Sequence, residues 1–495
     1  MLFTQLPARR KPPSDAPGAF LTIDLWDDYH FKTMFDLWCS NGTQQVHVGL
    51  LRIGKIAMGH GRVEVPDTFE TLDQTYFSLG GDESFYVTLR DRFDDETRRS
   101  VLTALRDAAY DLDIFSQAKG EDVMRESLLR NTSPATVRGQ FNRIAKGGPT
   151  QTEFNVRYRQ EHATEDGPTL KINLKVDPDA KPPSNIHALI GSNGVGKTRL
   201  LDTLARTVLA PQGYLPGSRL EDHGEHRQHP FSNLVAVSFS AFDSQVPLDK
   251  SAAVDYRYVG LKQNGTTPVK DLSLLSGDFV EAVKACMSGG PARAARWQQV
   301  LARLEATDLI FQDQEISRLA ADEALRPDPA DLFIPLSSGH KIVLLTLARL
   351  VEHTTERTLV LIDEPEAHLH PPLLSTFIRV LSELLFERNG LALIATHSPV
   401  VLQEVPAEAV WALRRVGSDI RVDHPEIETF GENVGVITRE IFALEVTKTG
   451  FHAMIEDLAS RGLSFEGILA ELDGKLGAEG RALARIAARR HGNGG

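Results

Sequence analysis

The sequence predicts an α/β fold with a mostly parallel sheet, a helical subdomain and an N-terminal α/β extension. From about residue 185 to 440, short apolar runs alternate with helical patterns, as buried parallel strands do when helices cover both faces of their sheet. The expected strands are IHALIG, VAVSFS, TLVLID and LALIAT. Residues 250–335 interrupt this alternation with helical spacing, notably in ARAARWQQVLARLEATDLIF. No heptad repeat is sustained there, so a long coiled-coil arm is not expected.

Composition narrows the class of protein before any motif is considered. With 495 residues, 41% of them hydrophobic and 24% charged, the chain can bury two or three cores and is not disordered as a whole. The net charge of -13 argues against a protein that coats nucleic acid non-specifically. It does not exclude a local basic groove, because net charge says little about patches. Cys39 and Cys286 are too few for a disulfide framework, and no apolar run approaches the roughly 20 residues of a spanning helix. We therefore expect a cytoplasmic protein without a membrane-embedded part.

The most specific motif is GSNGVGKT, which fits the phosphate-binding pattern G-x-x-x-x-G-K-[ST] between the expected strand IHALI and the expected helix RLLDTLARTVL. Its glycines allow successive backbone N–H groups to point at phosphate oxygens, and the positive end of the helix adds to the attraction. Lys197 is placed to reach the β- and γ-phosphates of ATP, and the Thr198 hydroxyl is placed to ligate Mg²⁺. The expected ATP-binding residues are Gly191, Ser192, Asn193, Gly194, Val195, Gly196, Lys197 and Thr198.

Two carboxylates, Asp363 and Glu364, end the apolar strand TLVLID. Open α/β sheets bind their ligands at the carboxyl ends of the strands. We expect Asp363 to hold the Mg²⁺ that Thr198 also holds, and Glu364 to act as the general base toward the attacking water. His397 ends the strand LALIAT at the matching position, where its imidazole can donate to the γ-phosphate or hold the water. Together with Lys197, Glu364 and His397 form the expected catalytic set.

The run LSSGHK, residues 336–341, comes directly before the strongly helical pattern IVLLTLARLVEH. A Ser/Gly turn that opens a helix offers a hydroxyl, backbone N–H groups and a helix dipole to an anion. A serine is also a favoured helix cap at any site, so the run alone leaves both interpretations open. The order of the motifs (P-loop, this turn, acidic strand, histidine strand) favours the anion site.

In this order the motifs resemble the ABC-type P-loop ATPases, and among them the soluble SMC-like and OLD-like branch. GSNGVGKT is similar to Walker A, LSSGHK to the LSGGQ signature, LIDEPEAHLHP to Walker B with the D-loop, and ATHSP to the switch histidine. The resemblance implies ATP hydrolysis by a homodimer or higher homo-oligomer, in which Ser337 and Gly339 contact the γ-phosphate bound by the other protomer. His340 stands where the family has glutamine, and Ser338 where it has its first glycine.

The resemblance also concerns a Q-loop ligand and the histidines of the D-loop. The loop that usually carries a glutamine should follow VAVSFSAFDSQ, and Ser240 and Gln245 are both candidates for its ligand. His368 and His370 belong to the D-loop and are expected to line the dimer seam. Because no further ligand has a recognisable spacing, we expect no metal site there.

The N-terminal part resembles bacterial AAA family ATPases of anti-phage defence systems, the PtuA-like ATPases of the Septu type. The similarity lies in YFSLGGDESFYVTL and SLLRNTSPATVRGQFNRIAKGG. It implies a nucleotide-dependent sensor or switch whose effector, an HNH-type nuclease, is a separate protein.

These patterns divide the chain into six segments. They are a flexible tail (1–19), an N-terminal α/β extension (20–145), an ATPase N-lobe with Walker A (146–249), a helical insert (250–335), an ATPase C-lobe with signature, Walker B and switch histidine (336–440), and C-terminal helices with a tail (441–495). We expect the C-terminal helices to close the head. The basic end carries Arg481, Arg485, Arg489 and Arg490, for which a frayed, solvated tail is favoured over contact with phosphate.

Three other functions are compatible with parts of the pattern. An ABC transporter subunit is disfavoured by the run EAHLHP, the long N-terminal part and the lack of a spanning segment. A DNA repair or chromosome-organising ATPase of the SMC and RecF type is the main alternative, and it predicts a DNA-stimulated ATPase with steep salt dependence. An OLD nuclease is disfavoured because only about 55 residues follow FGENVGVITREIF, too few for a Toprim domain by the size of ordinary domains.

Overall fold

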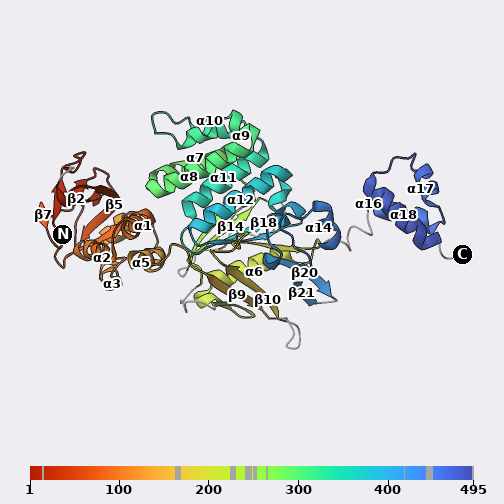
Figure 1. Ribbon diagram of the computed structural model, residues 1–495, viewed down its shortest axis with the longest axis horizontal. Coiled ribbons are helices and arrows are strands. Elements are labelled where there is room, and N and C mark those ends of the chain that lie inside the picture. Colours follow the sequence, from red (N-terminus) through yellow and green to blue (C-terminus); the bar gives the residue numbers. More distant parts are fainter. Residues whose placement is uncertain are drawn as a thin grey trace.

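The structure is a computed structural model, and it describes residues 1–13, 16–161, 169–222, 230–239, 248, 254–263, 266–416, 419–441 and 450–492. Figure 1 shows an N-terminal unit, a central head and a C-terminal group of helices along the longest axis. Four hydrophobic clusters of buried residues correspond to these parts, one in the N-terminal unit, two in the head and one in the C-terminal group. Across the described residues, no helix combines the length and the apolar character needed to cross a bilayer.

The head is built on a seven-stranded sheet in which only the last strand runs antiparallel to its neighbour. Its strands, in spatial order, are β15 (Asp255–Gly260), β14 (Asn233–Ser238), β18 (Thr358–Asp363), β19 (Leu391–Ala395), β11 (Ile186–Gly191), β20 (Val410–Val416) and β21 (Asp419–Asp423). The strands expected from IHALIG, VAVSFS, TLVLID and LALIAT are β11, β14, β18 and β19, and the predicted α/β fold with a mostly parallel sheet is confirmed.

Both faces of this sheet are covered, which explains its uninterrupted apolar runs. In β18, Val360 and Ile362 pack into the cluster of the upper helices, whereas Leu359 and Leu361 pack into the cluster on the opposite face. The upper helices in Figure 1 are α7 (Leu272–Ser288), α8 (Pro291–Thr307), α9 (Leu309–Asp313), α10 (Pro329–Phe333), α11 (Ser338–His353) and α12 (Pro371–Glu387). The opposite face carries α6 (Lys197–Leu209) and a sheet of β10 (Leu170–Val176), β9 (Phe154–Gln160), β13 (Ser218–Asp222) and β12 (Tyr214–Leu215).

The segment expected to be a helical insert, residues 250–335, begins with strands instead. β15 forms the edge of the central sheet, and β16 (Lys262–Gln263) pairs with β17 (Thr266–Val269). The helical part starts only at α7. In DYRYVG, Tyr256 and Tyr258 flank Arg257 and are followed by Val259, which suits a half-buried edge strand, a pattern that the long helical runs after it obscured.

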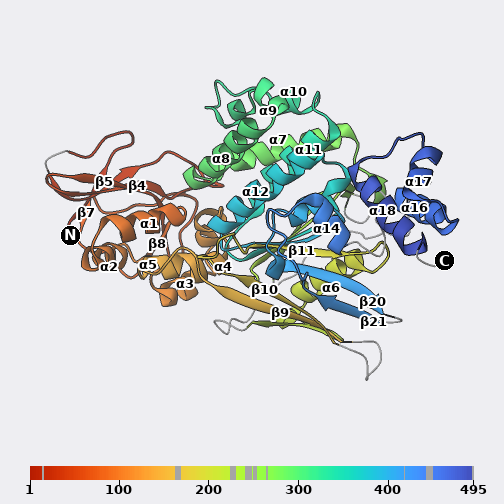
Figure 2. The ribbon, with the colours of Figure 1, turned by 45° about the vertical axis from the view of Figure 1, so that its right-hand side comes forward.

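The N-terminal unit is a six-stranded sheet packed against helices, as Figure 2 shows from a second side. Its strands, in spatial order, are β7 (Thr68–Phe69), β1 (Phe3–Leu6), β2 (Pro17–Ile23), β4 (Met34–Asn41), β5 (Gln45–Lys55) and β8 (Tyr76–Gly80). Its helices are α1 (Glu83–Arg92), α2 (Asp95–Ala104), α3 (Leu112–Ala118), α4 (Pro134–Thr136) and α5 (Asn142–Ala145).

The expectation of a flexible tail over residues 1–19 is wrong for the strand that lies within it. β1 pairs in parallel with β2 and antiparallel with β7. The side chain of Phe3 is fully buried and stacks on Phe69 at 4.9 Å between ring centroids. A four-residue strand gives little periodicity to read, and prolines and basic residues follow it directly.

Buried ion pairs join the N-terminal unit to the head. Glu83, at the start of α1, pairs with Arg296 of α8 at 2.6 Å and with Arg388, just after α12, at 2.8 Å. Arg143 of α5 pairs with the buried Glu356 at 2.7 Å. Such pairs are costly to break, because removing one partner leaves a buried charge uncompensated.

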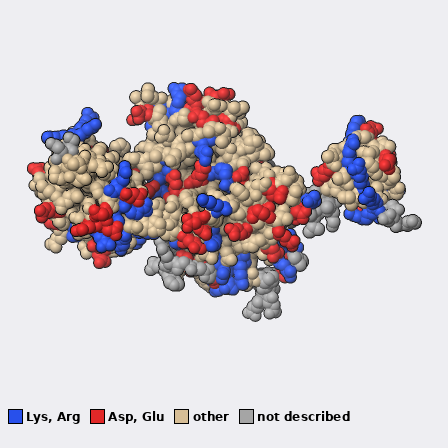
Figure 3. Space-filling model, in the orientation of Figure 1, with Lys and Arg blue, Asp and Glu red and all other residues tan. Residues whose placement is uncertain are grey.

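The C-terminal helices have a core of their own, contrary to the expectation that they close the head. α16 (Gly450–Ser460), α17 (Phe465–Glu471) and α18 (Ala478–Gly492) enclose a cluster that includes Ile455, Ile468 and Ala484. The predicted frayed tail is also wrong, because its arginines lie on the regular helix α18. Their side chains are exposed, and Figure 3 shows a band of Lys and Arg on the visible face of this unit.

Candidate functional site

The P-loop lies at the carboxyl end of β11 and leads directly into α6. Gly191, the last residue of β11, passes so close to β20 that a Cβ atom there would lie 2.6 Å from the carbonyl oxygen of Leu413. Only glycine fits this approach, which turns the loop tightly off the strand. Ser192, Asn193 and Gly194 are exposed, so their backbone can face a ligand. The strand–loop–helix setting expected for GSNGVGKT is therefore present.

Lys197 opens α6, and its side chain folds back over the loop. Its ammonium donates to the carbonyl oxygen of Gly191 at 3.0 Å and contacts Nε2 of His397. Lys197 is 5% exposed, so little water solvates this charge. An ammonium at this place, beside the glycine turn and the N-terminus of α6, can donate to a phosphate.

Asp363 is the last residue of β18, and it lies level with the last residues of the two neighbouring strands. In the sheet register it lies opposite Ser238 of β14 and Ala395 of β19. The carboxyl ends of β14, β18, β19 and β11 therefore meet at one edge. Thr198 lies at this edge in the first turn of α6.

Glu364 adopts a left-handed backbone with φ 46° and ψ 58°, which is uncommon for a residue other than glycine. Its N–H donates to the carbonyl oxygen of Ala395 at 2.9 Å, and this bond holds the unusual conformation. Its carboxylate lies 3.5 Å from Nε2 of His397. Backbone strain of this kind clusters at functional sites, and here it accompanies a carboxylate that lies beside His397.

Glu366, which is not among the predicted site residues, fixes the loop that carries His397. A carboxylate oxygen of Glu366 accepts a hydrogen bond from the backbone N–H of His397. The residue lies three positions after Asp363, in the run EPEAH. The sequence offered one signal for Glu366, since it is a third acidic residue close to the end of the strand. Its contact with His397, however, forms only in the folded loop.

These residues suit a nucleotide phosphate with Mg²⁺. The carboxylate of Asp363 and the hydroxyl of Thr198 are oxygen ligands of the kind that Mg²⁺ prefers. The glycine turn, the helix N-terminus behind it and the Lys197 ammonium supply the donors that a phosphate requires. Lys197, Asp363, Glu364 and His397, predicted from separate motifs, thus lie together in the folded chain.

The predicted signature residues lie in a different place, at the start of α11. Ser337 caps this helix, and its hydroxyl lies 2.5 Å from Nδ1 of His340. A Cβ atom on Gly339 would lie 2.6 Å from the carbonyl oxygen of His368, so glycine is required where the D-loop crosses the helix. Ser337 itself is exposed, as a residue that contacts another molecule must be. The two Q-loop candidates, Ser240 and Gln245, lie outside the described residues.

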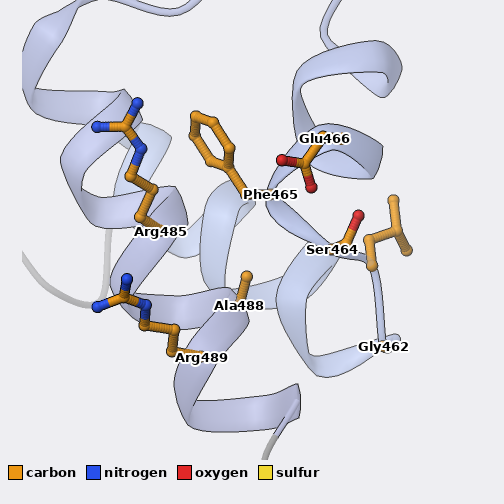
Figure 4. Close-up of a pocket in the computed structure, with 8 residues that line it drawn as sticks. Gly462, Ser464, Phe465, Glu466, Arg485, Ala488 and Arg489 are labelled. Carbon is orange, nitrogen blue, oxygen red and sulfur yellow. The ribbon is translucent and has the colours of Figure 1, made fainter.

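The C-terminal unit contains a separate hollow, drawn in Figure 4. It has a volume of about 500 Å³, and the guanidinium of Arg485 lies over the ring of Phe465 at 4.6 Å from the ring centroid. Arg489 lines the same side. The predicted nucleotide residues do not line this hollow, so the candidate site is the edge of the central sheet.

Comparison with known proteins found a family model that matches part of this chain and solved structures that are similar to part of it. Residues 218–403 match the family described as "AAA domain, putative AbiEii toxin, Type IV TA system". Solved structures with a similar arrangement include an ATP-binding cassette of an ABC transporter, MJ1267 in its ADP conformation, at 12% identity and a TM-score of 0.32 over 61% of this chain and 100% of that one. The SMC head domain from Thermotoga maritima matches at 10% identity and a TM-score of 0.30 over 56% of this chain and 100% of that one.

A relative with a similar sequence covers almost the whole chain. Protein ea59 of Escherichia phage lambda is 35% identical over 508 aligned positions, which span 96% of this chain and 95% of the phage protein. The match therefore includes the N-terminal unit and the C-terminal helices as well as the head. The chain belongs to the family of the phage lambda protein ea59.

Proposed function

We propose that this chain is an ATP-hydrolysing switch that binds Mg–ATP between two copies of its head. The observation that carries this proposal is the convergence of Lys197, Glu364 and His397 at one edge of the parallel sheet. Three charged or titratable groups from separate motifs meet there next to a glycine turn. A purely structural role would not require a lysine and a glutamate to share one histidine.

The triphosphate would lie along residues 191–198, with backbone N–H groups and the Lys197 ammonium as its donors. Thr198 and Asp363 would hold Mg²⁺. When bound, this ion neutralises charge on the phosphate oxygens. On binding, Lys197 would exchange its contact with His397 for the γ-phosphate.

Glu364 is the proposed general base. Its carboxylate would accept a proton from the attacking water, which the imidazole of His397 would hold in line. The left-handed backbone at Glu364 and the hydrogen bond that the His397 N–H donates to Glu366 keep both groups in place. Positioned groups of this kind typically contribute 10²–10⁴-fold to a rate.

The second half of the site would come from another copy. Ser337 and Gly339 start α11, where a hydroxyl, N–H groups and the helix dipole can face an anion. Their contacts within the chain are with His340 and His368 rather than with the P-loop. The chain would thus be a homodimer, or a higher homo-oligomer, only while ATP joins its heads.

The biological role that we propose is a switch in the conflict between phages and their hosts, with a separate effector such as an HNH-type nuclease. Its support is the relative from phage lambda and the family description, which names a toxin of a toxin–antitoxin system. DNA-stimulated hydrolysis that falls steeply with salt would instead favour a DNA repair or chromosome-associated ATPase.

Mixed dimers test the shared site. Lys197→Ala destroys the P-loop half and Ser337→Arg blocks the signature half, so each variant alone should lose ATPase activity. In a mixed dimer, one interface keeps an intact P-loop from one copy and an intact signature from the other. Mixing should therefore restore part of the activity. If tagged pairs are shown to associate but stay inactive, the site is not shared between copies.

A further inference from the structure

The structure places three possible metal ligands together beside the signature helix. Asp308, His340 and His370 each offer a ligand atom, and these atoms lie within 4.8 Å of one another. They come from the residue before α9, the first turn of α11 and the residue before α12. From the sequence no metal site is expected at the D-loop histidines His368 and His370, because no further ligand has a recognisable spacing; the folded chain brings Asp308 and His340 next to His370.

We propose that Asp308, His340 and His370 form a binding site for a divalent transition-metal ion of the Zn²⁺ type. Two histidines and one carboxylate are a usual protein ligand set for zinc, with a fourth position left for water or another ligand. Imidazole nitrogen suits zinc and its neighbours rather than Mg²⁺ or Ca²⁺, which prefer oxygen.

The distances within the cluster fit this ion. Two ligand atoms at about 2.0–2.1 Å from a tetrahedral ion lie about 3.3–3.4 Å apart. Nε2 of His340 lies 3.3 Å from each carboxylate oxygen of Asp308. The rings of His340 and His370 lie edge to face at 6.0 Å between centroids. A small side-chain rotation of the exposed His370 would bring its nitrogen to the same spacing.

Nδ1 of His340 meets the hydroxyl of Ser337 at 2.5 Å, so this ring can bind an ion through Nε2 while Nδ1 donates to the serine, as metal-bound histidines do. Nδ1 of His370 accepts from the N–H of Leu373 at 3.3 Å, which places the proton of the neutral ring on Nε2. Binding of an ion by His370 would therefore give up this long hydrogen bond, which the exposed ring can do by rotating. Phe311 packs edge-on against His340 at 4.9 Å between centroids and limits its movement.

The surroundings hold His340 and Asp308 in place. His340 is only 3% exposed, and Asp308 is held by accepting from the N–H groups of Ile310 and Phe311. The close crossing of Gly339 and the carbonyl of His368 ties the D-loop to α11, two residues before His370. The site would therefore join the signature turn, the D-loop and the helical subdomain.

An ion here would also orient the signature serine, a consequence that rests on the proposed function. With Nε2 on the ion, Nδ1 of His340 carries the proton and donates to the Ser337 oxygen. The Ser337 hydroxyl then keeps its own proton to donate outward, toward an incoming phosphate. Metal occupancy would thus set the polarity of the group that meets the nucleotide of the other copy.

Zinc titration of the full chain tests the site, with chelator-treated protein, a competing zinc indicator and no nucleotide. The wild type should bind one Zn²⁺ per chain. His370→Ala and Asp308→Asn should bind at least about tenfold more weakly. His370 is exposed and asparagine still caps a helix, so both variants should fold. The matched control is His368→Ala, a D-loop histidine whose Nε2 bonds to the carbonyl of Phe239.

Co²⁺ provides a second readout, because a tetrahedral site gives visible absorption bands that His370→Ala should lose and His368→Ala should keep. Lys197→Ala should also bind zinc normally, which separates this proposal from the ATPase proposal. Zinc affinity that is equal in the wild type and His370→Ala, or lost equally in His368→Ala, would overturn the site.

Discussion

The ammonium of Lys197 contacts Nε2 of His397, two residues that lie 200 positions apart in the sequence. This contact links the P-loop to the loop after β19. Since the ammonium also donates to the carbonyl of Gly191 at 3.0 Å, the lysine lies over its own loop. A γ-phosphate would compete with the histidine for the same charge.

Replacing Lys197 by alanine should weaken ATP binding by about 10- to 150-fold, because a charge-assisted hydrogen bond is worth about 1.5–3 kcal/mol. Titration calorimetry with Mg–ATP measures this change. Lys284→Ala is the matched control, since Lys284 is exposed on α7 and should leave the affinity unchanged. An affinity of Lys197→Ala equal to that of the wild type would refute the P-loop assignment.

Replacing Glu364 by glutamine should leave ATP affinity intact and lower the hydrolysis rate by about 10²–10⁴-fold, because the amide cannot accept the proton of the water. The ATP-bound dimer should then accumulate, which size-exclusion chromatography with and without ATP detects. Glu323→Gln, an exposed glutamate in the helical part, serves as the control. Normal turnover in Glu364→Gln would remove this residue as the base.

The parts of the site that the sequence predicts are those with local signatures. GSNGVGKT and TLVLID carry their setting in neighbouring residues, so β11, α6 and β18 could be placed without a structure. Asp308 has no such signature. It reaches His340 only because α9 packs beside α11, and a contact between two helices 32 positions apart has no spacing rule that marks it.

The sequence pattern also did not predict the short strand β1 or the separate core of the C-terminal helices. β1 is four residues long, and its two neighbours in the sheet are β2 and β7. It forms a hairpin with neither, because β2 runs parallel to it and β7 lies about 60 residues further along the chain. The helices α16, α17 and α18 each have one apolar face, and such a face fits a core of its own as well as the head. Tertiary contacts decided both cases.

The two ion pairs that Glu83 forms with Arg388 and Arg296 should make the stability of the protein depend on pH in the acidic range. Burial raises the pKa of the Glu83 carboxyl, but the charges of Arg388 and Arg296 outweigh this effect and lower the pKa to about 2. A depressed pKa adds stability above the unfolded value, near pH 4.5, and this contribution is lost as the pH falls toward 2. A shift of this size corresponds to about 3 kcal/mol.

Glu83→Gln should therefore lower the unfolding midpoint at pH 7 and flatten its decline between pH 4.5 and 3. Thermal unfolding at several pH values measures both effects. Glu96→Gln, at an exposed position on α2, should behave as the wild type. A Glu83→Gln variant with the stability and acid sensitivity of the wild type would show that the pair contributes nothing.

The strand β1 gives a direct test of whether the first residues belong to the folded N-terminal unit. Phe3 is fully buried and stacks on Phe69, so Phe3→Ala should cost about 3–5 kcal/mol of the unfolding free energy. Leu2→Ala is the control, because Leu2 is 52% exposed and should change stability little. Urea unfolding followed by fluorescence of Trp38, on β4, reports on this sheet after replacement of the other tryptophans. If Phe3→Ala and Leu2→Ala unfold at the same urea concentration, β1 does not contribute to the core and the first residues are a tail after all.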